Sequence, residues 1–236
     1  MSFFQYGEKV EGYDVLVLNE REARAGAGIL FAMGLLSLMN AVALGHLIVT
    51  QVFISFFTLD FFMRVIQPRY SPSLLLGRFF VQNQRPEYVG AIQKRFAWSI
   101  GLLLAVPMFY LLVIDFQPNP IKVLVCIICL LLLFLESAFS ICVGCKIFGI
   151  FKKDPVTHCP GGVCEIRVKD PIQTFNMAQK VITFTVMLAF GVGAYTYFTK
   201  VESKTFLAKK VKLMMMSDVE REAFEEAKRQ REFDEF

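Results

Sequence analysis

Five long apolar runs constrain the fold of this chain more than any other feature of its sequence. A helix needs about 20 apolar residues to cross the ~30 Å hydrocarbon core of a bilayer. Runs of that kind lie at residues 25–44, 47–63, 96–116, 123–144 and 181–198, the last being short for a span. Hydrophobic residues make up 55% of the chain, whereas about 45–50% is usual in soluble domains. The sequence therefore predicts an all-α fold: a polytopic integral membrane helical bundle with a four-helix core and a fifth transmembrane helix.

The distribution of Lys and Arg predicts how the spans are oriented, because cytoplasmic loops retain an excess of both. Six of these residues lie between positions 64 and 95 and six more between 146 and 180, whereas the intervening short turns hold only Lys122. We therefore expect a multi-pass protein of a bacterial inner (cytoplasmic) membrane, with a cytoplasmic N-terminus. The run 181–198 breaks this pattern, since it would export a lysine-rich tail. Either the tail lies outside or this run does not cross.

The remaining segments are polar. The first 24 residues lack the apolar region of a signal peptide, so we expect the N-terminus to be retained. The net charge of +4 is spread over the loops, so the lipid bilayer and not nucleic acid is the expected partner. Prolines break the segment 66–90, whose apolar part we expect along the membrane surface with Arg78 reaching the headgroups. The predicted organisation is an N-terminal cytoplasmic segment (1–24), a four-span membrane core (25–150), a cysteine-containing cytoplasmic loop (151–180), a fifth span (181–198) and a charged helical tail (199–236).

The six cysteines fall into three spaced pairs: Cys126 with Cys129, Cys142 with Cys145, and Cys159 with Cys164. The first pair lies deep in an apolar run, and we interpret it as small packing residues. The second pair sits at the cytoplasmic end of the same run, where Gly144 permits a bend and a soluble reductant could reach the sulfurs. The partial negative charge of a helix C-terminus would disfavour a thiolate there, although the nearby lysines could offset it.

The pairs Cys142/Cys145 and Cys159/Cys164 together offer four sulfurs, with 13 residues between Cys145 and Cys159. A tetrahedral zinc site is chemically possible, and His158 adjoins it, but C-x4-C is not the usual spacing of a zinc knuckle. An iron–sulfur cluster needs a similar convergence of thiolates. A permanent disulfide is disfavoured in the reducing cytoplasm. The preferred interpretation is reversible exchange, in which one pair passes electrons or persulfide sulfur to the other.

Charged residues inside apolar runs are costly and are therefore candidates for function. Asp60 and Arg64 are spaced as an i,i+4 structural ion pair. Glu136 lies six residues before Cys142 and could move a proton when a thiol is oxidised, or it could pair with a Lys or Arg of the bundle. No hydrolase, phosphate-binding or dinucleotide motif occurs, so no cofactor is specified. The candidate catalytic residues are Cys142, Cys145, Cys159, Cys164 and Glu136.

Four stretches carry a resemblance to a known family: "LNEREARAGAGIL" (18–30), "DFFMRVIQPRYSPSLLLGRFFV" (60–81), "QKRFAWSIGLLL" (93–104) and "ESAFSICVGCKIF" (136–148). Over about residues 18–150 the chain resembles the bacterial integral membrane proteins of domain-of-unknown-function family 4395. The resemblance implies a four-span bundle without an established activity. It also implies a thioredoxin-like or sulfurtransferase protein as a partner, by association only. Residues 151–236 have no counterpart in that pattern.

Together these features predict a bacterial inner-membrane protein that handles thiol redox or persulfide transfer through cytoplasm-facing cysteine pairs. Two alternatives are a structural or accessory membrane subunit without chemistry of its own and a small transporter of a sulfur compound.

Overall fold

The computed structural model describes residues 6–44, 47–114, 120–151 and 174–200. The chain divides into two compact units, of which the first holds the helical bundle and the second holds helix α7. Each unit is described by itself.

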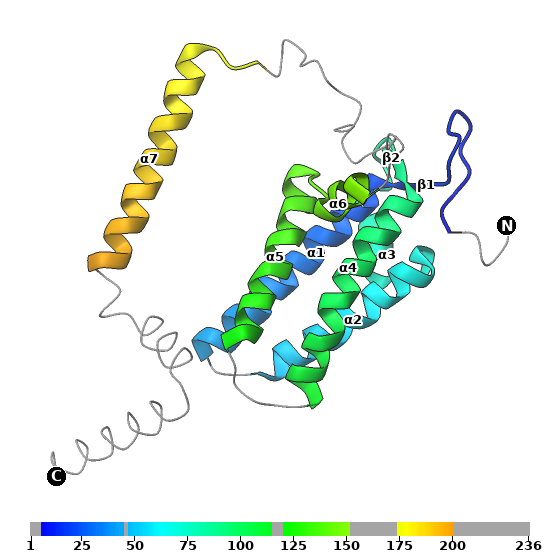
Figure 1. The fold of residues 1–236 in the computed structure, drawn as a ribbon, viewed down its shortest axis with the longest axis horizontal. Helices are drawn as coiled ribbons and strands as arrows, with labels where there is room; N and C mark the ends of the chain where they lie inside the picture. Colours follow the sequence, from blue (N-terminus) through cyan, green and yellow to red (C-terminus); the bar gives the residue numbers. More distant parts are fainter. Residues whose placement is uncertain (1–5, 45–46, 115–119, 152–173, 201–236) are drawn as a thin grey trace. The chain divides into compact units, whose positions relative to one another are not determined.

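The bundle consists of four long helices and two short ones (Figure 1). The long helices are α1 (Glu20–Met39), α2 (Ile48–Ile66), α4 (Ala91–Phe109) and α5 (Pro120–Phe139), and the short ones are α3 (Pro72–Val81) and α6 (Val143–Phe151). The π-helical segments η1 (Asn40–Leu44) and η3 (Tyr110–Ile114) extend α1 and α4, and a 3-10 turn, η2 (Pro68–Tyr70), precedes α3. The main packing contacts join α1 to α3, α2 to α4, and α4 to α6.

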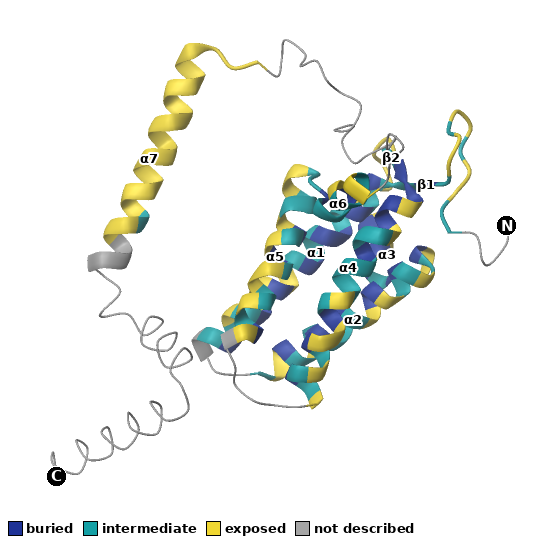
Figure 2. Ribbon diagram, viewed as in Figure 1, coloured by how far each residue is buried: buried dark blue, intermediate teal, exposed yellow. Residues whose placement is uncertain are grey.

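Five helices of the described chain are long and apolar enough to cross a membrane, including α7. They are Glu20–Val42, Ile48–Ile66, Ala91–Ile114, Ile121–Phe139 and Met177–Thr196. Figure 2 shows that the bundle helices bury some faces and expose others, and large apolar side chains such as Leu36 and Leu103 are among the exposed residues. An apolar outer surface is stable in lipid, so the predicted all-α, multi-pass membrane bundle is confirmed.

A short antiparallel ribbon ties two of the spans together at one end of the bundle. Strand β1 (Val17–Asn19) pairs with β2 (Tyr88–Gly90), and each strand runs directly into a long helix, α1 or α4. Asn19 caps α1 by accepting a hydrogen bond from the Arg21 N–H at 3.1 Å. The ribbon therefore fixes the first turns of α1 and α4 next to each other.

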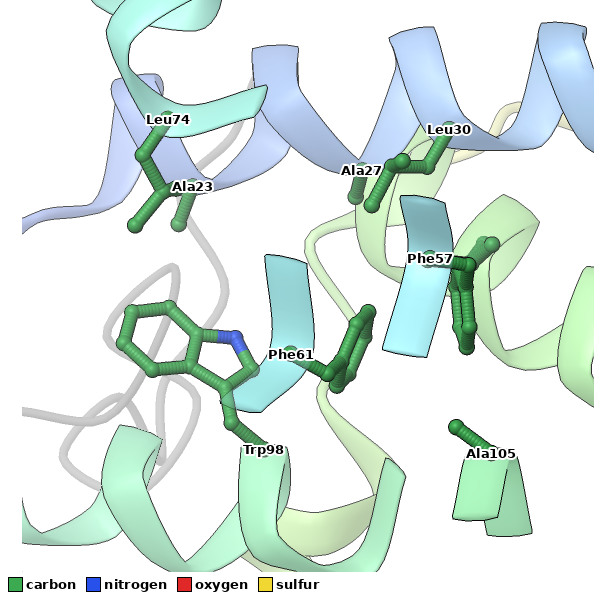
Figure 3. Packing of buried hydrophobic residues seen from close by; sticks show 9 residues of the cluster. Ala23, Ala27, Leu30, Phe57, Phe61, Leu74, Trp98 and Ala105 are labelled. Atoms are coloured by element: carbon green, nitrogen blue, oxygen red, sulfur yellow. The ribbon is translucent and has the colours of Figure 1, made fainter. Parts of the chain in front are cut away.

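The core beneath this end is built from aromatic residues of α2 and α4 and small residues of α1 (Figure 3). Phe57, Phe61 and Trp98 are at most 5% exposed. Helix α3 lies close against α1 because Gly77 has no side chain: a Cβ there would come within 2.6 Å of the Glu22 carbonyl oxygen. Arg78 of α3 pairs with Glu22 at 3.1 Å, and its side chain is 48% exposed.

The fourth apolar run differs from the prediction of one helix over residues 123–144. Helix α5 ends at Phe139, Ser140 adopts a left-handed conformation (φ 55°), and α6 begins at Val143. The chain thus turns within "FSIC" and starts a new helix. The pair Cys142/Cys145 therefore lies at the start of a helix and not at the end of one.

Helix α7 (Met177–Lys200), taken by itself, begins with a reciprocal cap. The Asn176 side chain accepts from the Gln179 N–H at 2.8 Å, and the Gln179 side chain accepts from the Asn176 N–H at 3.0 Å. The tail that follows, and hence its side of the membrane, lies outside the described residues.

Candidate functional site

Cys142 is the N-cap residue of α6. Its carbonyl oxygen accepts the Lys146 N–H at 3.1 Å, which is the first hydrogen bond of the new helix. Its sulfur accepts the Cys145 N–H at 3.4 Å, as an N-cap side chain does. The expectation of a helix C-terminus at this pair was wrong, because the turn at Ser140 separates α5 from α6. A helix N-terminus carries partial positive charge and favours a thiolate.

The two thiols of this pair have opposite tendencies to ionise. A hydrogen bond from the Cys145 side chain lowers the pKa of Cys142, aided by the charge of Lys94 and opposed by burial. The same hydrogen bond, together with burial, raises the pKa of Cys145 well above its ordinary value. The first cysteine is therefore the one prepared to be a thiolate, and the second keeps its proton. Both are free thiols in this structure, as are Cys126 and Cys129 of α5.

The glycine between the two cysteines allows α6 to lie directly on α4. A Cβ on Gly144 would come within 2.6 Å of both the Cα and the Cβ of Ala97. This close approach buries the pair, leaving Cys142 7% exposed and Cys145 3% exposed. The "CVGC" sequence thus combines a capping sulfur, a contact glycine and a second sulfur one turn later.

A buried lysine lies beside the pair and joins three helices. Lys94 of α4 is fully buried, and its Nζ lies 2.8 Å from Glu20 Oε2 of α1 and 2.7 Å from Glu136 Oε1 of α5. The expected pairing of Glu136 with a basic residue of the bundle is confirmed. Two carboxyl groups share one ammonium, and the charge of Arg24 also acts on Glu20, so full ionisation of the buried group is costly unless Arg24 balances the second carboxylate. This triad, Glu20–Lys94–Glu136, is therefore a place where a proton can be held.

Glu20 and Lys94 escaped the sequence reasoning. Each stands just before the apolar run that was assigned as a span, where a charge looked like the end of the membrane segment. The signal that could have revealed them is that acidic and basic residues without a local partner stand at the ends of different spans, where they could pair with each other.

A second buried ionic network, around Asp60 and Arg64, has a structural role. Asp60 and Arg64 form the predicted i,i+4 ion pair at 2.8 Å, and both side chains are 0% exposed. The Asp60 carboxylate also accepts hydrogen bonds from both Ser71 and Ser73, at the start of α3. This network fixes the connection from α2 to α3, and it is separate from the cysteine pair.

The structure thus brings three of the five predicted site residues into one region: Cys142, Cys145 and Glu136. The other two, Cys159 and Cys164, lie outside the described residues, as does His158. The predicted exchange between the two cysteine pairs therefore stays a prediction. Within residues 6–44, 47–114, 120–151 and 174–200, no three His, Cys, Asp or Glu side chains converge as metal ligands.

Comparison with known proteins gives one match. A family model described as "Domain of unknown function (DUF4395)" matches residues 18–153. No curated protein and no solved structure matches the chain. The matched region contains the triad and the first cysteine pair of the site, and it ends before Cys159.

Proposed function

Because the chain belongs to the DUF4395 family, a domain of unknown function, we propose a function from the site itself: reversible thiol–disulfide chemistry at Cys142 and Cys145 in a bacterial inner membrane. The observation that carries this proposal is the position of Cys142 as the N-cap of α6, where the helix terminus and a hydrogen bond both favour its thiolate. The Lys and Arg counts of the loops favour a cytoplasmic location for this end of the bundle.

The roles of the two sulfurs follow from their ionisation. The Cys142 thiolate attacks an electrophilic sulfur or another two-electron acceptor, and Cys145 resolves the covalent intermediate by attacking the Cys142 sulfur. Oxidation of the pair releases two electrons and two protons in all. The Glu20–Lys94–Glu136 triad can receive a proton as Cys145 becomes a nucleophile. The same groups return it when the disulfide is reduced.

The second pair, Cys159 and Cys164, extends this proposal toward a soluble partner. Closing a loop of this length costs only a modest and slowly growing chain entropy. We propose that this pair exchanges electrons or sulfur with Cys142 and Cys145, and then with a thioredoxin-like or sulfurtransferase protein. This part rests on the sequence alone.

A mass-resolved thiol count tests the proposal. The purified full-length chain is equilibrated in glutathione buffers of increasing oxidation, quenched with acid and alkylated. We expect the Cys142 and Cys145 peptides to become disulfide-linked reversibly, and Cys142→Ser or Cys145→Ser to abolish the link. Cys126→Ser is the matched control and should leave it intact.

Two outcomes would favour other functions. A Cys142 peptide heavier by one sulfur atom after incubation with a sulfurtransferase and its sulfur donor would indicate persulfide transfer in place of disulfide exchange. If Cys142 and Cys145 remain free thiols under all conditions and gain no sulfur atom, the site has only a structural role.

A further inference from the structure

A small cavity adjoins the sulfur of Cys142. Its volume is about 120 Å³, and it lies among α2, α4, α5 and α6. Cys142, Glu136, Cys129 and Trp98 contribute the only polar or sulfur-bearing side chains to a lining that is otherwise aliphatic or aromatic. An apolar protein cavity of roughly 150 Å³ accommodates a benzene molecule, and this space is somewhat smaller, so a six-membered ring enters it only if the lining side chains shift.

The cavity also borders an unsatisfied hydrogen-bond donor. Trp98 is 2% exposed, and its Nε1 has no hydrogen-bond partner within the described part of the chain. Figure 3 shows the indole nitrogen on the edge of the ring nearer to Phe61, which lines the cavity, with Ala23 and Leu74 above the ring. A buried donor without a partner costs roughly 1–3 kcal/mol. An acceptor oxygen carried by a ligand could satisfy this donor.

The cavity offers an apolar approach to the Cys142 sulfur. Cys142 and Cys145 are buried, so direct attack by a folded partner protein needs a local opening of the bundle. Leu104 of α4 and Leu132 of α5 line the cavity and are half-buried, so they lie at the outer surface of the bundle. Because α4 and α5 are spans, that surface faces lipid hydrocarbon. A reaction partner that arrives this way must be small and lipid-soluble.

We propose that the cavity binds the ring of a membrane quinone, which exchanges two electrons with the Cys142/Cys145 pair. A quinone combines a flat apolar ring with two carbonyl oxygens, one of which can accept the Trp98 N–H. This inference deepens the proposed function and rests on it.

Oxidation of the cysteine pair by the quinone takes two bond-forming steps. The Cys142 thiolate adds to a ring carbon and forms a carbon–sulfur bond. The Cys145 sulfur then attacks the Cys142 sulfur, the sulfur–sulfur bond forms, and the carbon–sulfur bond breaks with both electrons staying on the ring. The two protons of the dithiol pass to the two ring oxygens, and Glu136 lies where it can carry one of them. One dithiol and one quinone thus give one disulfide and one quinol.

The test uses the reduced full-length chain in lipid nanodiscs and decylubiquinone as the probe. Loss of the quinone's ultraviolet absorbance and the Cys142–Cys145 disulfide are measured in the same samples. We expect one disulfide per quinol formed, with saturation in quinone. Trp98→Phe removes the N–H together with part of the indole ring and should raise the half-saturating quinone concentration by at least the roughly 3- to 10-fold that loss of one hydrogen bond gives. Leu132→Phe narrows the cavity and should do the same, whereas Cys126→Ser, outside this cavity, should match the wild type.

The outcomes separate the two proposals. A chain that forms the disulfide in glutathione buffer but not with quinone would overturn the quinone inference and leave the thiol function standing. Oxidation by quinone with no change in half-saturation in either cavity variant would overturn the assignment to this cavity. A chain that reacts with neither oxidant would overturn both.

Discussion

Removal of the Lys94 ammonium is the perturbation that most severely tests the buried triad. Lys94→Met keeps an unbranched side chain of similar length but leaves the carboxyl groups of Glu20 and Glu136 without their shared cation. Those two side chains are only 1% and 12% exposed, so water screens them poorly. Removing one partner of a buried pair costs about 3–5 kcal/mol.

The expected loss can be measured by thermal unfolding of the detergent-solubilised chain. A change of about 1 kcal/mol shifts the melting temperature of a chain of 150–250 residues by roughly 2–4 °C. Lys94→Met should therefore melt about 6–20 °C below the wild type. The control Lys9→Met changes an exposed lysine and should stay within about 0.5 kcal/mol.

A compensated variant separates lost charge balance from lost packing. Lys94→Met combined with Glu20→Gln and Glu136→Gln removes all three charges while preserving the shapes of the side chains. It should recover most of the lost melting temperature, since a buried ionic cluster and its neutral replacement are often similar in stability. A Lys94→Met protein as stable as the wild type, or a triple variant no better than the single one, would refute the charge-sharing argument.

Three further predictions concern the helix break, the contact glycine and the orientation. Gly144→Ala should lower the free energy of unfolding by about 1–3 kcal/mol and displace α6, since the new methyl group would overlap α4. Gly193→Ala is the matched control and should not destabilise the chain, because no described neighbouring atom lies within 4 Å of the added Cβ. Ser140→Gly should raise stability by up to about 1 kcal/mol, because glycine adopts the left-handed conformation without strain; a lower melting temperature would show that the serine side chain contributes more than its backbone costs. An impermeant maleimide should label Cys159 and Cys164 only after the membrane is opened, and rapid labelling in intact cells would reverse the assigned orientation.

The sequence was sufficient for the architecture because crossing a membrane requires long apolar helices, and their lengths are visible in the chain. It also identified Cys142, Cys145 and Glu136 as candidates, since sulfur pairs and charges are conspicuous in such runs, and these three lie in one region of the structure. It did not reveal that α5 stops at Phe139. The turn there depends on a serine in a left-handed conformation, with no glycine or proline at the break to announce it.

The partner of Glu136 also depended on the fold. Lys94 lies in another helix, and β1 and β2 hold its first turn beside that of α1, where Glu20 resides. Pairing across helices is a tertiary property, because it depends on which helix ends meet. The reversal at Cys142 has the same origin: one local turn converts the end of a helix into the beginning of another, and so changes the electrostatic setting of the sulfur.

The most direct test of the account is the pH dependence of Cys142 alkylation. The full-length chain is treated with a small membrane-permeant thiol reagent over the range of about pH 5 to 10, and the modified peptides are quantified by mass, with Cys126 as the internal control. The Cys142 rate should rise to half its maximum below the ordinary thiol value of 9.0, since thiolate forms as pH rises through a lowered pKa. Cys145→Ser keeps a hydrogen-bond donor and should keep the low midpoint, whereas Cys145→Ala should move it upward. A midpoint at or above 9.0 in the wild type, with Cys142 reacting no faster than Cys126, would contradict the claim that this sulfur is the reacting thiolate.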